Sequence, residues 1–422
     1  MSHRHRLFPA AALATLALAL PAASQNARKG PETLLYIDLA THDMPGMPAM
    51  GGPGRMAMGM FGGRGGNNTY GSTQHPAMPG QYMDVTLRNS LDPGGAASDA
   101  VPGGLRLGDS LPLLAPKRPP SGPDERDVPQ FAGKPPDAAA RILIYWGCGT
   151  DVRAGQPKVF EVSSKDGKVK VSGSLQGRYA PDRDPRTGPD TALWPNEKDT
   201  RSVPDGASVA GEHHVTGDRV PASLKFALGQ AQDFMPKIAL ARAGDLASGQ
   251  TWRWQPVANA RGYFLSAMGM QGDTLVLWTS SETPDAGMGL VDYLPNATVD
   301  KWIKEKVLLA PTVGACGIPK GIFAGKDGNA AAGMLQMIAY GPETNLSWPP
   351  KPKDPKVAWD PEWNVRVRTK STAMAMLGMD FGAAMQGRDD GDDATDARQE
   401  QAAEPKQDKP NVKSLLKGLL GR

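Results

Sequence analysis

The sequence predicts a mainly β protein with two β-sandwich-like domains and long loops rich in Gly, Pro and Met. Gly and Pro make up about a fifth of the 422 residues, which excludes a helical bundle or a coiled coil. Short runs of alternating apolar and polar residues, separated by Gly, Pro and Asp, are typical of antiparallel strands. The chain also exceeds the roughly 250–300 residues at which single cores stop growing, so we expect more than one core.

The first 24 residues have the pattern of a secretory signal peptide. Arg4 and Arg6 precede an apolar run from Leu7 to Leu20, and small residues up to Ser24 offer a cleavage site. No later segment is long and apolar enough to span a bilayer, so we expect no transmembrane segment and a periplasmic or secreted protein. Removing residues 1–24 lowers the net charge from +3 to +1, which gives no reason to expect nucleic-acid binding.

The first domain is expected over residues 31–243, with a Met- and Gly-rich insertion at residues 42–79. Its expected strands are the β-branched and aromatic runs between turn residues, at 33–40, 81–89, 141–146, 158–163, 168–174, 212–215, 222–228 and 237–242. A further strand-competent piece covers 104–107. Short strands with these breaks suggest an antiparallel sandwich or barrel.

The second domain is expected over residues 244–370 and begins with three strands at hairpin spacing, at 251–257, 262–268 and 274–280. Trp254-Gln255-Pro256, then Ala260-Arg261-Gly262-Tyr263 and later the run 335–340 carry a resemblance to fibronectin type III and related immunoglobulin-like domains over residues 244–345. The resemblance implies a sandwich and no particular activity. Residues 298–308 depart from it, because their apolar residues fall at helical spacing behind Thr298 as a cap.

The C-terminal region changes character after the last expected strand, at 364–369. Residues 387–411 are charged and poor in apolar side chains, which predicts a disordered linker. Residues 412–422 then predict an amphipathic helix, whose apolar face comprises Val412, Leu415, Leu416, Leu419 and Leu420. A helix this short orders only against another surface, so we expect it to contact an envelope protein or a membrane surface.

The two cysteines, Cys148 and Cys316, lie 168 positions apart. An oxidising compartment would allow them to form a disulfide that staples the two expected domains together. The alternative is that Cys148 is a buried apolar residue, because it follows Ile142, Ile144 and Trp146 in strand alternation.

Methionines in the insertion give the most specific chemical signal of the sequence. Met44, Met47 and Met50 recur at a spacing of three, with His42 before them and His75 further on. Thioethers are soft ligands that suit Cu(I), and the segment resembles the methionine-rich loops of periplasmic copper-handling proteins. A plain loop or an interaction surface is the alternative. A second group is expected to be core or interface: Met374, Met376, Met379 and Met385.

Two further chemistries deserve comparison with these. Ser208 lies in a segment that differs at one residue from a nucleophile elbow, and His213 and His214 are nearby in the sequence. The strand before it and the helix after it, which such an elbow needs, are missing from the sequence pattern. Five tryptophans could stack on sugar rings, although Trp252 and Trp254 share a face that more simply forms core; the five are Trp146, Trp194, Trp252, Trp254 and Trp278. P-loop, HExxH and CxxC motifs are absent from the sequence.

These observations favour a non-catalytic binding or scaffold protein of the cell envelope, in which no catalytic residue and no cofactor is expected. One alternative is a periplasmic copper-binding protein that uses the Met-rich loop. The other is an envelope protein that binds or hydrolyses glycans.

Overall fold

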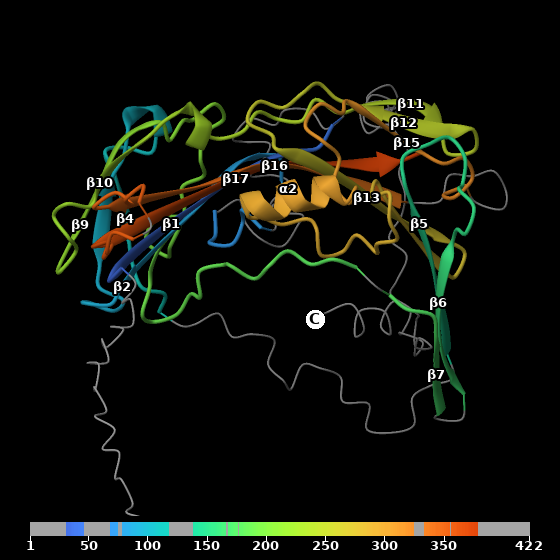
Figure 1. Ribbon diagram of the computed structural model, residues 1–422, viewed down its shortest axis with the longest axis horizontal. Coiled ribbons are helices and arrows are strands. Elements are labelled where there is room, and N and C mark those ends of the chain that lie inside the picture. The colour runs from blue at the N-terminus through green and yellow to red at the C-terminus, as the bar shows by residue number, and fades with distance from the viewer. Residues whose placement is uncertain are drawn as a thin grey trace, which may run out of the picture.

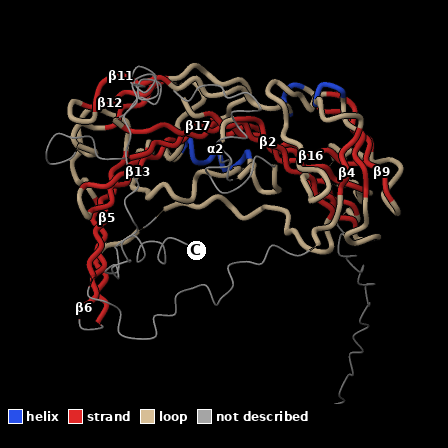
Figure 2. The backbone as a smooth tube through the Cα atoms, turned by 180° about the vertical axis from the view of Figure 1, so that it is seen from behind, coloured by secondary structure: helices blue, strands red, loops and turns tan. Residues whose placement is uncertain are grey.

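The computed structural model describes residues 31–45, 68–74, 78–117, 138–165, 168–175, 177–324, 333–354 and 356–378. The expected signal peptide, the linker 387–411 and the helix 412–422 lie outside these residues, as does most of the insertion 42–79. Strands and irregular loops make up nearly all of the described chain (Figure 2). The mainly β prediction is therefore confirmed.

The largest element of the described structure is a ten-stranded sheet (Figure 1). Its strands, in spatial order, are β7 (Lys168–Ser172), β6 (Lys158–Lys165), β5 (Ala138–Trp146), β14 (Thr274–Thr279), β13 (Gly262–Gln271), β16 (Gly333–Trp348), β17 (Trp363–Leu377), β1 (Thr33–Asp43), β2 (Gly80–Asn89) and β8 (Ala192–Trp194). The pairs β1–β17 and β14–β5 are parallel and the others are antiparallel. Both parallel pairs join segments that are distant in sequence.

Two smaller sheets pack against opposite ends of the large sheet (Figure 1). The four-stranded sheet contains β10 (Lys225–Leu228), β9 (Gly211–Gly217), β3 (Ala97–Ala100) and β4 (Ser110–Leu113). The three-stranded sheet contains β11 (Ala241–Asp245), β12 (Gly249–Arg253) and β15 (Ala315–Ile318). Each small sheet encloses its own hydrophobic core with the large sheet, so the molecule has two sandwich-like cores.

The cores are joined by the hairpin of β16 and β17, whose strands of 16 and 15 residues span about 50 Å at 3.3 Å per residue. Trp363 and Val367 on β17 belong to the first core, whereas Leu377 on the same strand belongs to the second. The strands β5, β6 and β7, from the first expected domain, continue the large sheet beyond β14. The proposed boundary at residue 243 therefore does not separate two sheets.

Helical structure is limited to short segments within the described residues. The helix α2 (Asn296–Lys304) lies against the middle of the large sheet and buries Val299 and Trp302 (Figure 1). A helix was expected here, but it begins two residues before the expected Thr298 cap. The piece 104–107 is not a strand: η1 (Gly103–Leu105) is a 3-10 turn between β3 and β4, and it buries Leu105. A second 3-10 turn, η2 (Gln230–Gln232), precedes residues 233–240, which run from the first core to the second and are called here the passage between the cores.

Candidate functional site

The central strand β17 carries three buried cations on one face. Arg366, Arg368 and Lys370 alternate with Val365 and Val367, which belong to the first core on the other face. The three cations are 5%, 4% and 1% exposed. Charged side chains are almost never buried to this degree unless they are paired, so their partners decide what the layer can do.

Acidic side chains from three separate segments meet two of these cations. The Nε of Arg368 donates to the Oδ1 of Asp38 on β1 at 2.7 Å, and its Nη2 donates to the Oδ1 of Asp184 at 2.7 Å. The Nζ of Lys370 donates to the Oδ1 of Asp292 at 3.0 Å. Burial would raise the pKa of Asp292, but the positive charges of Lys370 and Arg368 lower it below its usual value.

Aromatic rings complete this charged layer. The guanidinium carbon of Arg368 and the Nζ of Lys370 lie 4.4 Å and 4.3 Å from the ring centroid of Tyr293. Arg366 lies 4.6 Å over the ring of Tyr36. Such cation–π contacts are strongest where water is excluded. Arg368 and Lys370 are thus paired within a buried network that packs loops against the sheet. Arg366 donates from its Nη1 to the Arg183 carbonyl at 2.6 Å, whereas its buried Nε and Nη2 have no hydrogen-bond partner within the described residues.

Two titratable groups beside this layer have strongly displaced pKa values. Burial raises the pKa of Asp84 on β2 to about 7, although its carboxylate accepts bonds from the Gly71 amide and the Thr73 hydroxyl. Burial, aided by the charge of Lys370, lowers the pKa of His42 to about 4. His42 is therefore neutral at physiological pH, whereas Asp84 titrates close to it.

The predicted copper ligands are divided between described and undescribed parts of the chain. His42 is fully buried, and its Nδ1 bonds the Oγ1 of Thr372 at 2.8 Å. Met44 follows β1 directly and is half-buried. Met47, Met50 and His75 lie outside the described residues, so copper binding by the loop stays a prediction. No group of three or more His, Cys, Asp or Glu within the described ranges is placed to hold a metal ion.

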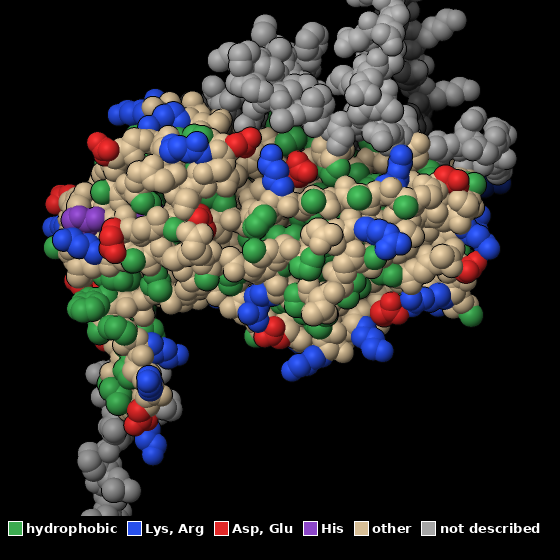
Figure 3. Space-filling view, turned by 90° about the horizontal axis from the view of Figure 1, so that it is seen from above, with side chains coloured by type: hydrophobic (Ala, Val, Ile, Leu, Met, Phe, Trp, Pro, Cys, Tyr) green, Lys and Arg blue, Asp and Glu red, His purple; other side chains and the backbone are tan. Residues whose placement is uncertain are grey.

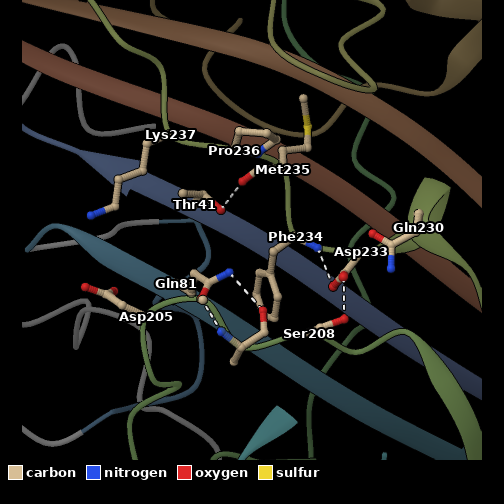
Figure 4. A pocket seen from close by; sticks show the side chains of 12 residues that line it. Thr41, Gln81, Asp205, Ser208, Gln230, Asp233, Phe234, Met235, Pro236 and Lys237 are labelled. Carbon is tan, nitrogen blue, oxygen red and sulfur yellow. Dashed lines mark hydrogen bonds between the residues drawn. The ribbon is translucent and has the colours of Figure 1, made fainter. Parts of the chain in front are cut away.

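A hollow of about 400 Å³ opens on the opposite face of the sheet, between the two cores (Figure 4). Hydrogen bonds hold its walls: the Thr41 hydroxyl donates to the Met235 carbonyl at 2.7 Å, and the Gln81 side chain exchanges two bonds with the Ala207 backbone. Asp205, Gln230 and Lys237 also line it, and the side chains of these three are exposed. The hollow thus has a hydrogen-bonded wall of polar and apolar residues, including Phe234 and Pro236, and charges of both signs at its mouth.

Ser208 is part of this wall. Its hydroxyl donates to the Oδ2 of Asp233, and the Oδ1 of Asp233 accepts bonds from the amides of Val209 at 3.0 Å and Phe234 at 2.8 Å. Asp233 therefore fixes the passage between the cores against the loop that precedes β9. A hydroxyl that donates to a buried carboxylate in this way is not arranged like the serine of a hydrolase, which donates to a histidine.

The histidines near Ser208 do not complete a catalytic site. The Nε2 of His213 bonds the Val209 carbonyl at 2.9 Å, and its Nδ1 lies 3.4 Å from the Oδ2 of Asp99. The ring also stacks on Phe226 at 5.0 Å. Both ring nitrogens of His213 are thus directed to other partners, which contradicts a serine hydrolase based on Ser208 and His213. His214 is the next residue on β9 and therefore points to the other face of its sheet, away from His213.

The tryptophan platform for sugars is also wrong. All five tryptophans are at most 9% exposed: Trp146, Trp194, Trp252, Trp254 and Trp278. The shared face of Trp252 and Trp254 lies in the second core, as the simpler interpretation expected. Buried rings cannot stack on a sugar from solvent, so these tryptophans no longer support the prediction of glycan binding.

Cys148 and Cys316 form a disulfide with their Cα atoms 5.0 Å apart. The bond joins the loop after β5 to β15, and both cysteines contribute to the second core. Beside it, the Gly149 amide donates to the Gly317 carbonyl at 3.0 Å. The disulfide therefore fastens the three-stranded sheet to the large sheet within one core, and it does not link two separate domains.

The chain matches no family model, curated protein or solved structure. The resemblance to fibronectin type III domains over residues 244–345 thus stays a prediction.

None of the helices in the described ranges has the length and apolar run needed to cross a membrane. On the face shown in Figure 3, Lys and Arg side chains are interspersed with Asp and Glu.

Proposed function

We propose that this protein is an exported, non-catalytic binding protein of the cell envelope that holds a small zwitterionic ligand in the hollow between its two cores. The observation that carries the proposal is a difference between the residues in the wall of the hollow and those at its mouth. The wall residues Thr41, Gln81 and Ser208 bond to other protein groups, whereas Asp205 and Lys237 are exposed at the mouth. A fixed wall with a few exposed charges suits recognition, and it lacks the paired nucleophile and base that catalysis needs.

The volume and the charges indicate the kind of ligand. About 400 Å³ lies within the range of small-molecule sites, roughly 300–1,000 Å³. A ligand with one anionic and one cationic group, such as a short peptide, could pair with Lys237 and Asp205 while its backbone meets Gln230. Export is supported by the signal-peptide pattern and by the disulfide, because such bonds persist mainly in oxidising compartments.

Calorimetric titration with a set of dipeptides to tetrapeptides tests this proposal. We expect saturable binding that is lost in the Asp205→Ala/Lys237→Ala variant and retained in Lys198→Ala, which removes an exposed lysine away from the hollow. Glycan fragments serve as a second ligand set. Binding of glycans alone would contradict the peptide assignment, and cleavage of either ligand would contradict a non-catalytic role.

The C-terminal stretch containing Val412, Leu415, Leu416, Leu419 and Leu420 supports a second contact on its sequence pattern alone. We propose that it attaches the protein to an envelope protein or to an anionic membrane surface. Deletion of residues 412–422 should abolish cosedimentation with envelope fractions and leave ligand binding in the hollow unchanged. Unchanged cosedimentation would remove this contact from the proposal.

A further inference from the structure

Methionines from three neighbouring strands form a row across one face of the large sheet. Met268 on β13 is directly opposite Met334 on β16, and Met334 is directly opposite Met376 on β17. Directly opposite residues of antiparallel strands point to the same face, with Cβ atoms about 4.5–5.5 Å apart. Three methionines therefore lie on neighbouring strands of one face, although they are 66 and 42 positions apart in the sequence.

Two further methionines adjoin this row, which we call the methionine row. Met374 lies two residues before Met376 and so shares its face, and Met288 comes from the loop after β14. A hollow of about 250 Å³ is lined by Met268, Met288, Met334 and Met374 together with Ser266 and Gln336. Four of these five methionines thus border this space.

The exposure of these residues separates them from core methionines. Met268 and Met334 are 47% and 37% exposed. In contrast, Met337 is fully buried, although it lies on the same strand as Met334 and only three residues away, because it points to the second core. Leucine would serve packing as well at a half-exposed position, so apolar burial does not account for thioethers there.

The first methionine of the predicted copper loop approaches the same row. Strand β1 runs parallel to β17, and its last residue, Asp43, pairs with Ala373. Met44 directly follows this pair on one chain, as Met374 does on the other, and the recorded pairing ends at Asp43 and Ala373. The strand pairing thus places Met44 one residue beyond a position that lies next to β17.

We propose that the methionine row is a binding site for Cu(I), held by the thioethers of Met268, Met334 and Met374 or Met376, with Met44 as a further ligand. Thioethers are soft, neutral donors that favour Cu(I) over the harder divalent ions. Several such donors around an accessible hollow would hold the ion while leaving it exchangeable. The site is separate from the hollow between the cores and does not depend on the function proposed for that hollow.

Silver(I), a redox-inert ion with the same ligand preference, allows the site to be mapped residue by residue. The full chain is labelled with ¹³C at the methionine methyl groups and titrated with Ag(I) while NMR spectra are recorded. We expect the methyl signals of Met268, Met334 and Met374 to move together and to saturate, while that of Met337 stays in place. Movement confined to other methionines, or no movement at all, would overturn the proposal.

Competition with a chromogenic Cu(I) chelator measures affinity for the biological ion. Ascorbate should be the reductant, since a thiol would attack the disulfide between Cys148 and Cys316. Leucine preserves volume and apolarity but removes the sulfur, so the Met268→Leu/Met334→Leu/Met374→Leu variant should fold normally and bind Cu(I) at least about tenfold more weakly. Met337→Leu is the matched control, and it should bind Cu(I) as the unaltered chain does.

Two outcomes of the competition experiment contradict the site. If the sheet variant binds Cu(I) normally and the Met44→Leu/Met47→Leu/Met50→Leu variant does not, the loop alone is the site. If the unaltered chain binds no Cu(I), the methionine row is an apolar surface for a partner or for the C-terminal stretch. Circular dichroism of each variant separates loss of binding from loss of folding.

Discussion

Replacement of Arg368 by methionine is expected to destabilise the protein strongly at neutral and alkaline pH. Arg368 is 4% exposed and pairs with both Asp38 and Asp184. Methionine fills much of the same space but leaves the buried carboxylate of Asp38 without the guanidinium that it bonds. Loss of one partner from a buried ion pair costs about 3–5 kcal/mol in the free energy of unfolding. Loss of the contact with the Tyr293 ring adds to this cost.

The pH dependence of this loss identifies its cause. Asp38 is directly opposite Asp84 in the β1–β2 register, so without the guanidinium two buried carboxyl groups face each other. Protonation of Asp84, whose pKa burial raises to about 7, removes the repulsion between the two groups, so stability should be regained at low pH and lost as pH rises. The difference between Arg368→Met and the unaltered chain should therefore be larger at pH 8 than at pH 5.

Urea denaturation followed by tryptophan fluorescence at pH 5 and pH 8 measures both effects. The Asp38→Asn/Arg368→Met variant is the control, because it removes both charges and should recover part of the stability at pH 8. A loss below about 1 kcal/mol at pH 8, or an equal loss at both pH values, would refute the electrostatic reasoning.

Three other changes test separate parts of the structure. The raised pKa of Asp84, about 7 instead of 3.8, stabilises the fold at low pH by at most about 4 kcal/mol, and this contribution is lost as pH rises through 7. Asp84→Asn should therefore flatten the decline in thermal stability between about pH 5 and pH 8. An unchanged slope would refute the assignment. The Cys148→Ala/Cys316→Ala variant should lose about 5 kcal/mol by the chain-entropy relation for a span of 168 residues, which urea titration can measure; a loss below about 1 kcal/mol would count against this. Gly317→Ala should destabilise by about 1–3 kcal/mol, because its Cβ would lie 2.8 Å from the Gly149 carbonyl oxygen; an unchanged melting temperature would show that the loop yields.

Local pattern predicted most strands of this protein but not their partners. The runs at 33–40, 81–89, 141–146 and 262–268 all fall within strands, because alternation over several residues is a local property of sequence. The pairing of β1 with β17 joins Asp38 to Arg368 across 330 residues, and no local pattern records it. The expected domain boundary at residue 243 fails to separate the sheets for the same reason.

The candidate sites differ in how visible they are in the sequence. Arg366 and Arg368 alternate with Val365 and Val367, and Lys370 continues the charged face, a pattern that predicts a strand but is equally typical of a solvated surface. Their burial depends on Asp184 and Asp292, which lie on loops that cover the face. The hollow between the cores is less visible still, since its wall combines residues of β1, β2 and two loops.

The charged layer and the methionine row occupy the same face of the large sheet, yet only the row is accessible. The layer fixes the parallel pairing of β1 and β17, since a slip of one residue would turn Arg368 into the apolar first core. Met334 has no comparable structural task, because its half-exposed side chain could be any apolar residue without altering the register. At one end of β17 the residues of this face are charged, are covered by loops and fix the pairing with β1. At the other end the residues of the same face are methionines, whose thioethers stay available for a ligand.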